Sequence, residues 1–467
     1  MRVLLIRPPR IKKAITIGEF MFSEPIGLEM VYQVIHQDHD VEIFDMMVDQ
    51  TTLETKLKVY KPDVIAVTSL CIDVFKVLHI CQEAKRINPN ILTAVGGTQT
   101  YLNPQAFMEA SVDFIFKFST RDNIQSFYKS LSTNKSIAID GILTKEKSYS
   151  ETFENQVNEY IVPNRKSTSS YRSFYSYFGY KPVAIMGLAQ GCDKQCRFCL
   201  RWRIEGGNEK VFDTDLIEED LLNIEEDTIM IFDNDMISSS EKIHMLCDLL
   251  EKNNLKKRFI GYGSVKAVMD NKEAIKRFKK NGLVALLVGY ESFSEIEMEY
   301  YQKKSKVSDN LDAAAFLKEQ GIDVWASFMA HPKWDKADFK AFRKYVKALK
   351  PQVGSLSPLT PFPNLPLYEE YKDRIIYNIE DYEKWSFGQV MIRPYNMTLR
   401  QYYFELLKTN LYVNIFVNNM HDLIKKFGMS SIIRLTLGSI KTFNKYVKLM
   451  LQADKMEASA REKALNQ

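Results

Sequence analysis

The 467-residue sequence contains no uninterrupted apolar run long enough to span a membrane. Its first residues, Met1–Pro9, are apolar but lack the length and cleavage site of a signal peptide, so no cleaved leader is expected. Cysteine is scarce, with six residues, and a secreted disulfide scaffold is therefore not expected. The net charge of +4 is too small to favour a nucleic-acid partner. What remains is a globular chain with room for two or three domains.

Three of the six cysteines stand close together. Cys192, Cys196 and Cys199 form the pattern Cys-x3-Cys-x2-Cys, with Phe198 directly before the last. Three thiolates on one loop can hold three irons of a [4Fe–4S] cube and leave the fourth iron open for chemistry. Such ligands must stay reduced, which predicts a cytoplasmic location. A zinc site is the alternative, but it needs a fourth ligand, and the closest histidine in the sequence, His244, is far away.

The N-terminal part of the chain alternates short apolar strands with amphipathic helices, which predicts an α/β fold with a doubly wound, flavodoxin-like parallel sheet. The expected strands are Val3–Arg7, Val41–Phe44, Val64–Thr68, Leu92–Val95 and Phe114–Phe116. Ligands on such sheets bind at the carboxyl ends of the strands. Asp45, Ser69 and the run Gly96-Gly97-Thr98 occupy those ends. Because glycine lets a ligand approach the backbone closely, we expect a ligand at this edge.

A second alternating series follows a connector. Its expected strands are Val183–Leu188, Thr228–Phe232, Arg258–Tyr262, Ala285–Gly289, Val324–Phe328 and Gly354–Ser357. After this series the alternation stops and aromatic residues become dense, which predicts a helical extension. The expected division is a Rossmann-like domain over 1–135, a connector over 136–180, an α/β unit over 181–370 and a helical extension over 371–467.

The cysteine motif, placed after the first strand of the second series, resembles the signature of the radical S-adenosylmethionine (SAM) superfamily. The resemblance implies a partial (β/α)6 barrel and a SAM molecule chelated by the open iron. It also implies that Phe198 packs near the adenine of SAM, and that Gly289, Glu291 and Ser292 contact its methionyl end or ribose. Asp233 is expected to place a carboxylate at the barrel mouth and to contact SAM as well. A surface or helix-capping role remains the alternative for Glu291.

The N-terminal part resembles cobalamin (B12)-binding domains, whose markers are Asp-x-His-x-x-Gly, Ser-x-Leu and Gly-Gly. Gly96-Gly97 is present, and Ser69-Leu70-Cys71 stands where Ser-x-Leu would be. Met47 stands where the family has its cobalt-ligating histidine. The resemblance implies cobalamin bound without a histidine ligand. The alternative is a Rossmann-like domain that only packs against the barrel. The residues implied at the cobalamin are Asp45, Met47, Ser69, Leu70, Gly96, Gly97 and Thr98.

Together the resemblances imply a cobalamin-dependent radical SAM enzyme, with methyl transfer to an unactivated carbon as the favoured reaction. In that chemistry the reduced cluster cleaves SAM to a 5′-deoxyadenosyl radical, and methylcobalamin supplies the methyl group. Tyr290 and His331 are the candidate catalytic residues, because both are expected to face the mouth. The expected partners are a small-molecule or lipid substrate and an electron donor such as flavodoxin or ferredoxin. Rearrangement or cyclisation without methyl transfer, and a metal-binding or electron-transfer module without turnover, remain alternatives.

The C-terminal extension ends in a basic amphipathic helix. Its large apolar residues recur at helical spacing, and basic residues follow on another stripe. The helix either covers the barrel or rests on an anionic membrane surface or an acidic partner. Packing is the favoured interpretation, because apolar helix faces are usually core. The two stripes consist of Ile433, Leu437, Ile440, Val447 and Leu451, and of Arg434, Lys441, Lys445 and Lys448.

Overall fold

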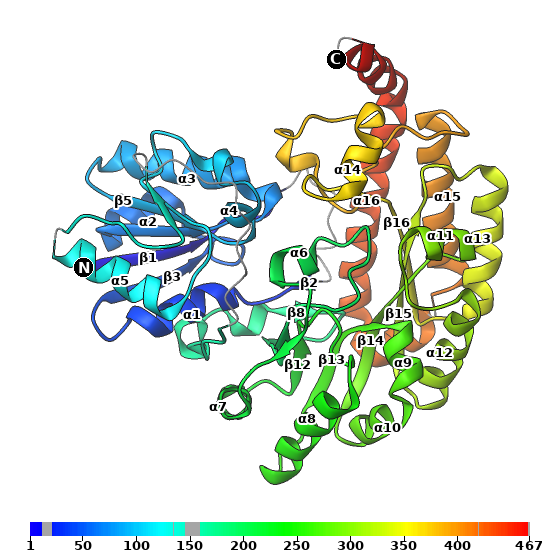
Figure 1. Cartoon of the computed structure of the whole chain (residues 1–467), viewed down its shortest axis with the longest axis horizontal. Coiled ribbons are helices and arrows are strands. Elements are labelled where there is room, and N and C mark those ends of the chain that lie inside the picture. The colour runs from blue at the N-terminus through cyan, green and yellow to red at the C-terminus, as the bar shows by residue number, and fades with distance from the viewer. Residues whose placement is uncertain (12–20, 134, 145–158, 419, 466–467) are drawn as a thin grey trace.

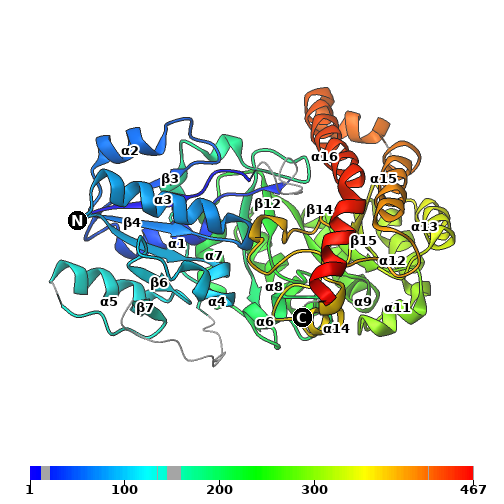
Figure 2. The same cartoon turned by 90° about the horizontal axis from the view of Figure 1, so that it is seen from above.

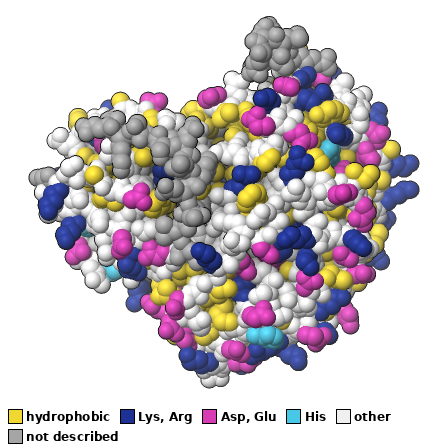
Figure 3. Space-filling view, in the orientation of Figure 1, with side chains coloured by type: hydrophobic (Ala, Val, Ile, Leu, Met, Phe, Trp, Pro, Cys, Tyr) yellow, Lys and Arg dark blue, Asp and Glu magenta, His cyan; other side chains and the backbone are white. Residues whose placement is uncertain are grey.

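The computed structural model describes residues 1–11, 21–133, 135–144, 159–418 and 420–465. It has two lobes side by side, an N-terminal lobe built on one sheet and a larger lobe built on a second sheet (Figures 1 and 2). The molecular outline is indented between the lobes, and hydrophobic side chains lie along the sides of this indentation (Figure 3).

The N-terminal lobe contains a doubly wound sheet in the order β3-β1-β4-β5-β6-β7. The strands β1 to β6 in this sheet pair in parallel, and β7 adds an antiparallel edge. All five predicted strands are confirmed, and the order is that of a flavodoxin-like sheet with one added strand. The strands are β1 (Arg2–Arg7), β3 (Asp40–Asp45), β4 (Val64–Thr68), β5 (Leu92–Gly96), β6 (Phe114–Phe116) and β7 (Ile142–Thr144).

Alternation along the strands explains why this sheet is covered on both faces. In β1, Val3 and Leu5 pack under α1 (Ile26–Ile35) and α5 (Arg121–Ser132). Leu4 and Ile6 point the other way, into the core that includes residues of α2 (Leu53–Tyr60) and α3 (Val74–Ile87). A strand buried on both sides is apolar at every position, as the run Val3–Ile6 is.

The larger lobe contains six parallel strands in the order β16-β15-β14-β13-β12-β9. They confirm the predicted partial barrel, with helices on its outer face (Figure 1). The strands are β9 (Ala184–Met186), β12 (Thr228–Ile231), β13 (Arg258–Ser264), β14 (Leu283–Glu291), β15 (Asp323–Ala330) and β16 (Val353–Pro358). The helices are α7 (Thr214–Asn223), α8 (Ser240–Lys252), α9 (Val265–Asp270), α10 (Lys272–Lys280), α11 (Glu295–Tyr300), α12 (Val307–Glu319) and α13 (Lys336–Leu349).

The C-terminal extension is helical, as predicted. It consists mainly of α14 (Pro366–Tyr371), α15 (Leu399–Phe416) and α16 (Met420–Leu465). Gly428 interrupts α16 with φ 76° and ψ 158°, a left-handed conformation that glycine adopts without strain. Among the described residues, no helix has both the length and the apolar character needed to cross a membrane.

The favoured packing of the apolar stripe on α16 is wrong for four of its five residues. The side of α16 that meets the core carries Tyr446 and Ala453, seven residues apart, and Val447 is partly buried beside them. The small alanine allows close approach of the helix. Ile432 is also buried, so the buried side of the helix is not the side of the predicted stripe. The exposed residues are Ile433, Leu437, Ile440 and Leu451. The side chain of Arg434 lies outside the described part of the structure.

A buried ion network joins the two lobes. Arg165 lies 2.7 Å from Glu24 and 2.8 Å from Asp220 of α7. Arg172 pairs with the same Glu24 and with Glu226. Removing one partner from such a network leaves an uncompensated buried charge, so the network fixes the N-terminal segment against the barrel.

Candidate functional site

The cysteine loop begins directly after β10 (Ala189–Gln190), at the carboxyl end of the first barrel strand. Gly191 has φ +90°, and a Cβ there would lie 2.1 Å from the backbone oxygen of Asn208. Only glycine fits this close crossing of two chain segments. Cys192 N–H then donates to Gly206 O at 3.1 Å. The indole N–H of Trp202 donates to Cys196 O at 3.0 Å, so hydrogen bonds hold the loop at its first and at its middle cysteine.

The three motif cysteines are free thiols on one loop, close enough to influence each other electrostatically. Burial, with smaller contributions from the charges of Cys196 and Cys192, raises the pKa of Cys199 to about 11. In the described part of the chain, no three His, Cys, Asp or Glu side chains converge as ligands of one metal ion would. The ligands of a cube bind separate irons, so they need not converge in this way. The donor set fits a [4Fe–4S] cluster with one open iron.

Two cations flank the thiols. Lys194, inside the cysteine loop, lies 2.7 Å from Asp235, and the Lys194 charge lowers the pKa of Cys192 against the effect of burial. Lys303 lowers the pKa of Cys196 in the same way. Both lysines stabilise negative charge on the sulfur ligands. Within the described structure, Asp235 Oδ1 is buried and accepts no hydrogen bond, so it can receive one from a ligand.

Glu291 lies at the mouth, as predicted. It ends β14 with φ 64°, at the point where the register with β15 shifts. A Cβ on Gly289 would lie 2.3 Å from Glu291 Oε1, so glycine at that position makes room for the carboxylate. Lys303 Nζ donates to the same oxygen at 3.1 Å, and the charge of Glu291 raises the pKa of Lys303. A buried carboxylate beside an ammonium can bind the amino group or a hydroxyl of SAM.

Phe198 packs edge-on against Tyr301, with ring centroids 5.4 Å apart. Arg197 N–H donates to Tyr301 O at 3.1 Å, which ties the cysteine loop to the end of α11. Tyr301 is fully buried, and its hydroxyl has no hydrogen-bond partner among the described residues. The surrounding cluster is apolar and includes Met329 and Leu359 from the ends of the last two strands. The side of the mouth around Phe198 and Tyr301 is therefore apolar.

Two residues predicted to contact SAM are bound to the protein itself. Asp233 is buried, accepts from Leu188 N–H at 2.8 Å and pairs with Lys242 at 3.0 Å. The Ser292 hydroxyl donates to Glu297. Both residues stabilise backbone segments next to the site. Asp233 binds the segment that leads into the cysteine loop, and Ser292 binds the turn after Glu291.

The two catalytic candidates differ in position. Tyr290 points away from the mouth, because alternation along β14 turns Gly289 and Glu291 inward and Tyr290 outward, where it stacks on Phe328 at 5.6 Å. The expectation that it faces the mouth is wrong. His331 does lie at the mouth, edge-on to Tyr300 at 5.5 Å. Burial lowers the pKa of His331 to about 4, so it is neutral at neutral pH.

The predicted ligand edge of the N-terminal sheet has the shape that a large ligand requires. Gly97 has φ +103°, and a Cβ there would lie 2.7 Å from Ser69 O. The ends of β4 and β5 therefore meet closely and leave Gly97 and Leu70 exposed. Asp45, by contrast, is buried and accepts from Met47 N–H at 3.0 Å and Tyr175 Oη at 3.1 Å. Asp45 therefore orders the loop that carries Met47. An exposed backbone edge with a small residue fits cobalamin.

The two predicted cofactor regions meet in space. Helix α4 (Thr98–Leu102), which begins after Gly97, contacts α6 (Arg201–Glu205), which begins two residues after Cys199. Asn364 Nδ2, from the segment that follows the last barrel strand, donates to Leu102 O at 3.4 Å. The ligand edge of the first sheet therefore borders the mouth of the barrel.

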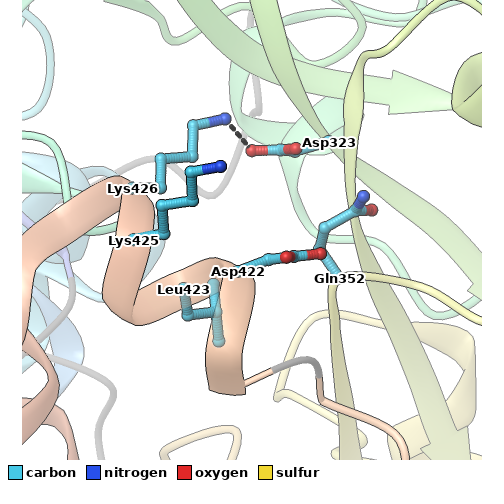
Figure 4. A pocket seen from close by; sticks show the side chains of 6 residues that line it. All are labelled: Asp323, Gln352, Asp422, Leu423, Lys425 and Lys426. Carbon is cyan, nitrogen blue, oxygen red and sulfur yellow. Dashed lines mark hydrogen bonds and ion pairs between the residues drawn. The ribbon is translucent and has the colours of Figure 1, made fainter.

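A separate hollow of about 430 Å³ opens at the amino ends of β15 and β16. Lys426 pairs with Asp323 across it, and both signs of charge are present (Figure 4). It contains no predicted site residue, and the cysteine loop lies at the opposite ends of the strands. The lining residues are Asp323, Gln352, Asp422, Leu423, Lys425 and Lys426.

Sequence patterns missed three residues at the mouth: Lys194, Lys303 and Tyr301. Lys194 stands between Cys192 and Cys196, so its charge beside the cysteines was a usable signal. Lys303 and Tyr301 follow α11 without any motif, and only the fold brings them to Glu291 and Phe198.

Two segments of the chain match known protein families. Residues 21–123 match the family model described as the B12 binding domain. Residues 186–346 match the model of the Radical SAM superfamily.

The chain is also similar to characterised proteins. It is 24% identical to the hopanoid C-3 methylase of Methylococcus capsulatus over 398 residues, 84% of this chain and 76% of that one. It is 22% identical to the anaerobic magnesium-protoporphyrin IX monomethyl ester cyclase of Rubrivivax gelatinosus, over 75% of this chain and 65% of that one.

Among solved structures, the fold resembles that of OxsB, a cobalamin-dependent S-adenosylmethionine radical enzyme with aqua-cobalamin and S-adenosylmethionine bound. The TM-score is 0.68 at 14% identity, covering 100% of this chain and 83% of that one.

Proposed function

We propose, from the premise that this chain belongs to the radical SAM enzymes that carry a B12-binding domain, that it methylates an unactivated carbon. Its cofactors are a [4Fe–4S] cluster, SAM and cobalamin. When bound, they supply a carbon-centred radical and a methyl group. The protein supplies the positions of the reacting groups and a mouth from which water is excluded.

The cluster is held by Cys192, Cys196 and Cys199. The charge of these sulfur ligands is offset by Lys194 and Lys303.

Three further side chains shape the SAM position. Glu291 accepts hydrogen bonds from the amino group or ribose of SAM, and Asp235 Oδ1 is a second buried acceptor beside it. Phe198 presents its ring at the adenine.

The observation that carries the proposal is the contact between α4 and α6. It puts the glycine edge of the cobalamin domain next to the cysteine loop, so a methyl donor on one side and a radical on the other can reach one substrate carbon. The apolar surroundings at Met329 and Leu359 favour an apolar small molecule or lipid as the substrate. The relation to the hopanoid methylase supports the same substrate class.

The products of SAM distinguish the reactions. Methyl transfer yields S-adenosylhomocysteine together with 5′-deoxyadenosine. We expect both from the anaerobically reconstituted enzyme with reductant and an apolar cell extract as the source of substrate. Cys196→Ala should give neither, whereas Cys247→Ala, which alters a buried cysteine outside the motif, should keep the product pattern.

Rearrangement or cyclisation is the second candidate, favoured by the similarity to the monomethyl ester cyclase. It predicts 5′-deoxyadenosine without S-adenosylhomocysteine under the same conditions. That product pattern would contradict methyl transfer and support rearrangement or cyclisation. Absence of both products from protein that contains four irons per chain would leave only a binding or electron-transfer role.

A further inference from the structure

One face of α16 exposes a row of large apolar side chains. Ile433, Leu437, Ile440 and Leu451 are 52%, 53%, 49% and 63% exposed. At 3.6 residues per turn, their spacings of four, three and eleven residues place them on one line along the helix. Single exposed apolar residues are common, but Ile433, Leu437 and Ile440 lie on adjacent turns, with Leu451 three turns further along the same line, and such a row marks an interaction site.

The rotation of the helix is fixed by contacts on its other side. Tyr446 is buried against the core, and its hydroxyl donates to Gly388 O at 2.7 Å. Ala453 is fully buried on the same side, seven residues further on. Since these contacts hold α16 against the barrel, the apolar row has to face outward.

Basic residues follow the row on one flank. Lys441 and Lys448 are exposed, and at 3.6 residues per turn they lie about 60–80° round the helix axis from the row. On the other flank the carboxylate of Asp454 is paired with Arg400 at 3.3 Å. An apolar row with a cationic edge is complementary to a surface that is apolar below and negatively charged above.

We propose that this face of α16 rests on an anionic lipid surface. The apolar row enters the boundary between headgroups and acyl chains, and Lys441 and Lys448 meet the headgroup phosphates. A second copy of the chain is a poorer occupant, because antiparallel pairing through the same row sets lysine flank against lysine flank. The contact is peripheral, and it stands whichever reaction the mouth catalyses.

Flotation of the reconstituted protein with vesicles tests the proposal. The protein should float with vesicles of equal parts phosphatidylglycerol and phosphatidylcholine, less at high salt, and weakly with phosphatidylcholine alone.

The variant Ile433→Ser/Leu437→Ser/Ile440→Ser should lower the vesicle partition coefficient at least tenfold. Its matched control, Val59→Ser/Leu222→Ser/Ile296→Ser, changes residues that are 76%, 54% and 81% exposed elsewhere and should bind as wild type. Lys441→Gln/Lys448→Gln should lose about fivefold per lysine on anionic vesicles only. Lys344→Gln/Lys347→Gln on the exposed side of α13 is its control.

Three results would overturn the proposal. The wild-type protein could fail to float with the anionic vesicles, or the triple serine variant could float as well as wild type. Light scattering could also show a dimer that depends on the row, which would assign the row to self-association. SAM cleavage by the triple variant serves as a folding control and should remain at the wild-type rate, so failure here is distinct from failure of the proposed reaction.

Discussion

At the scale of single residues, two lysines set the electrostatic environment of the cysteines. Lys303 is buried between Glu291 and the thiol of Cys196, where it neutralises the carboxylate and favours negative charge on the sulfur. Lys194 does the same for Cys192 from within the loop. The sequence predicted the cysteines from their spacing and Glu291 from its motif. It could not predict Lys303, because the pairing joins segments with no shared pattern.

Replacing Lys303 with Met should lower the reduction potential of the cluster, because a nearby cation favours the added electron. The expected shift is on the order of tens of millivolts. A redox titration followed by electron paramagnetic resonance measures it. Lys318→Met, on the exposed side of α12, should leave the potential unchanged. Equal potentials in the Lys303 variant and wild type would exclude an electrostatic role for Lys303.

Glu29 predicts a pH dependence of stability. Burial and the nearby charge of Glu24 raise the pKa of Glu29 from 4.5 to about 8. Between these values the folded state holds a proton that the unfolded state has released, so the free energy of unfolding falls as pH rises through this window.

Glu29→Gln should remove part of that fall and gain stability over wild type as pH rises from 6 to about 8.5. Urea unfolding at several pH values provides the measurement. A constant difference between variant and wild type would contradict the raised pKa. Glu83→Gln on the exposed side of α3 serves as the control.

At the scale of elements, the strands followed from the sequence because each is a short apolar run bounded by polar residues. The side of the sheet to which each residue points was harder to predict. Strand β14 continues two residues beyond its predicted end. Because side chains alternate along a strand, Tyr290 then points outward. The outward orientation of the row on α16 was not predicted, because large apolar residues usually form the buried face of a helix. The contact with the core is made instead by Tyr446 and by the small Ala453. Edge strand β7 was not predicted, because its three residues stand in the segment assigned to the connector.

Gly97→Ala tests the ligand edge of the first sheet. A Cβ at position 97 would lie 2.7 Å from Ser69 O and would force φ +103° on alanine, so the ends of β4 and β5 must move. We expect at least a tenfold weaker retention of cobalamin, measured by absorbance and cobalt content after gel filtration.

The neighbouring glycine is the matched control. Gly96→Ala meets only Phe116 Cβ at 3.6 Å, an ordinary contact, and should retain cobalamin as wild type does. Equal retention of cobalamin by both variants would show that this edge of the sheet is not part of the cobalamin site.

At the scale of the whole molecule, the site exists because two lobes are held in one arrangement. The alternating pattern predicted a parallel sheet in each lobe, but no local pattern shows how one lobe docks on the other. The docking depends on residues far apart in the sequence, such as Arg165 with Glu24 and Asp220. The contact between α4 and α6 follows from that docking.

Arg165→Met should therefore destabilise the protein by about 3–5 kcal/mol, because Glu24 and Asp220 would remain buried without their cation. Chemical denaturation gives the value. Arg121→Met, which removes an exposed contact to Glu159 at 3.9 Å, should cost no more than about 1 kcal/mol. If Arg165→Met also lost no more than about 1 kcal/mol of stability, the network would not be what holds the lobes together.

The most direct measurement of the central claim is the magnetic interaction between the two cofactors in one molecule. The claim is that cobalamin at the Gly97 edge and the cluster on Cys192, Cys196 and Cys199 share one mouth. In protein that contains cob(II)alamin, reduction of the cluster should broaden or split the cobalt resonance. Cys196→Ala should show the unperturbed signal under the same conditions. An unperturbed cobalt signal in fully loaded, reduced wild-type protein would contradict the shared site.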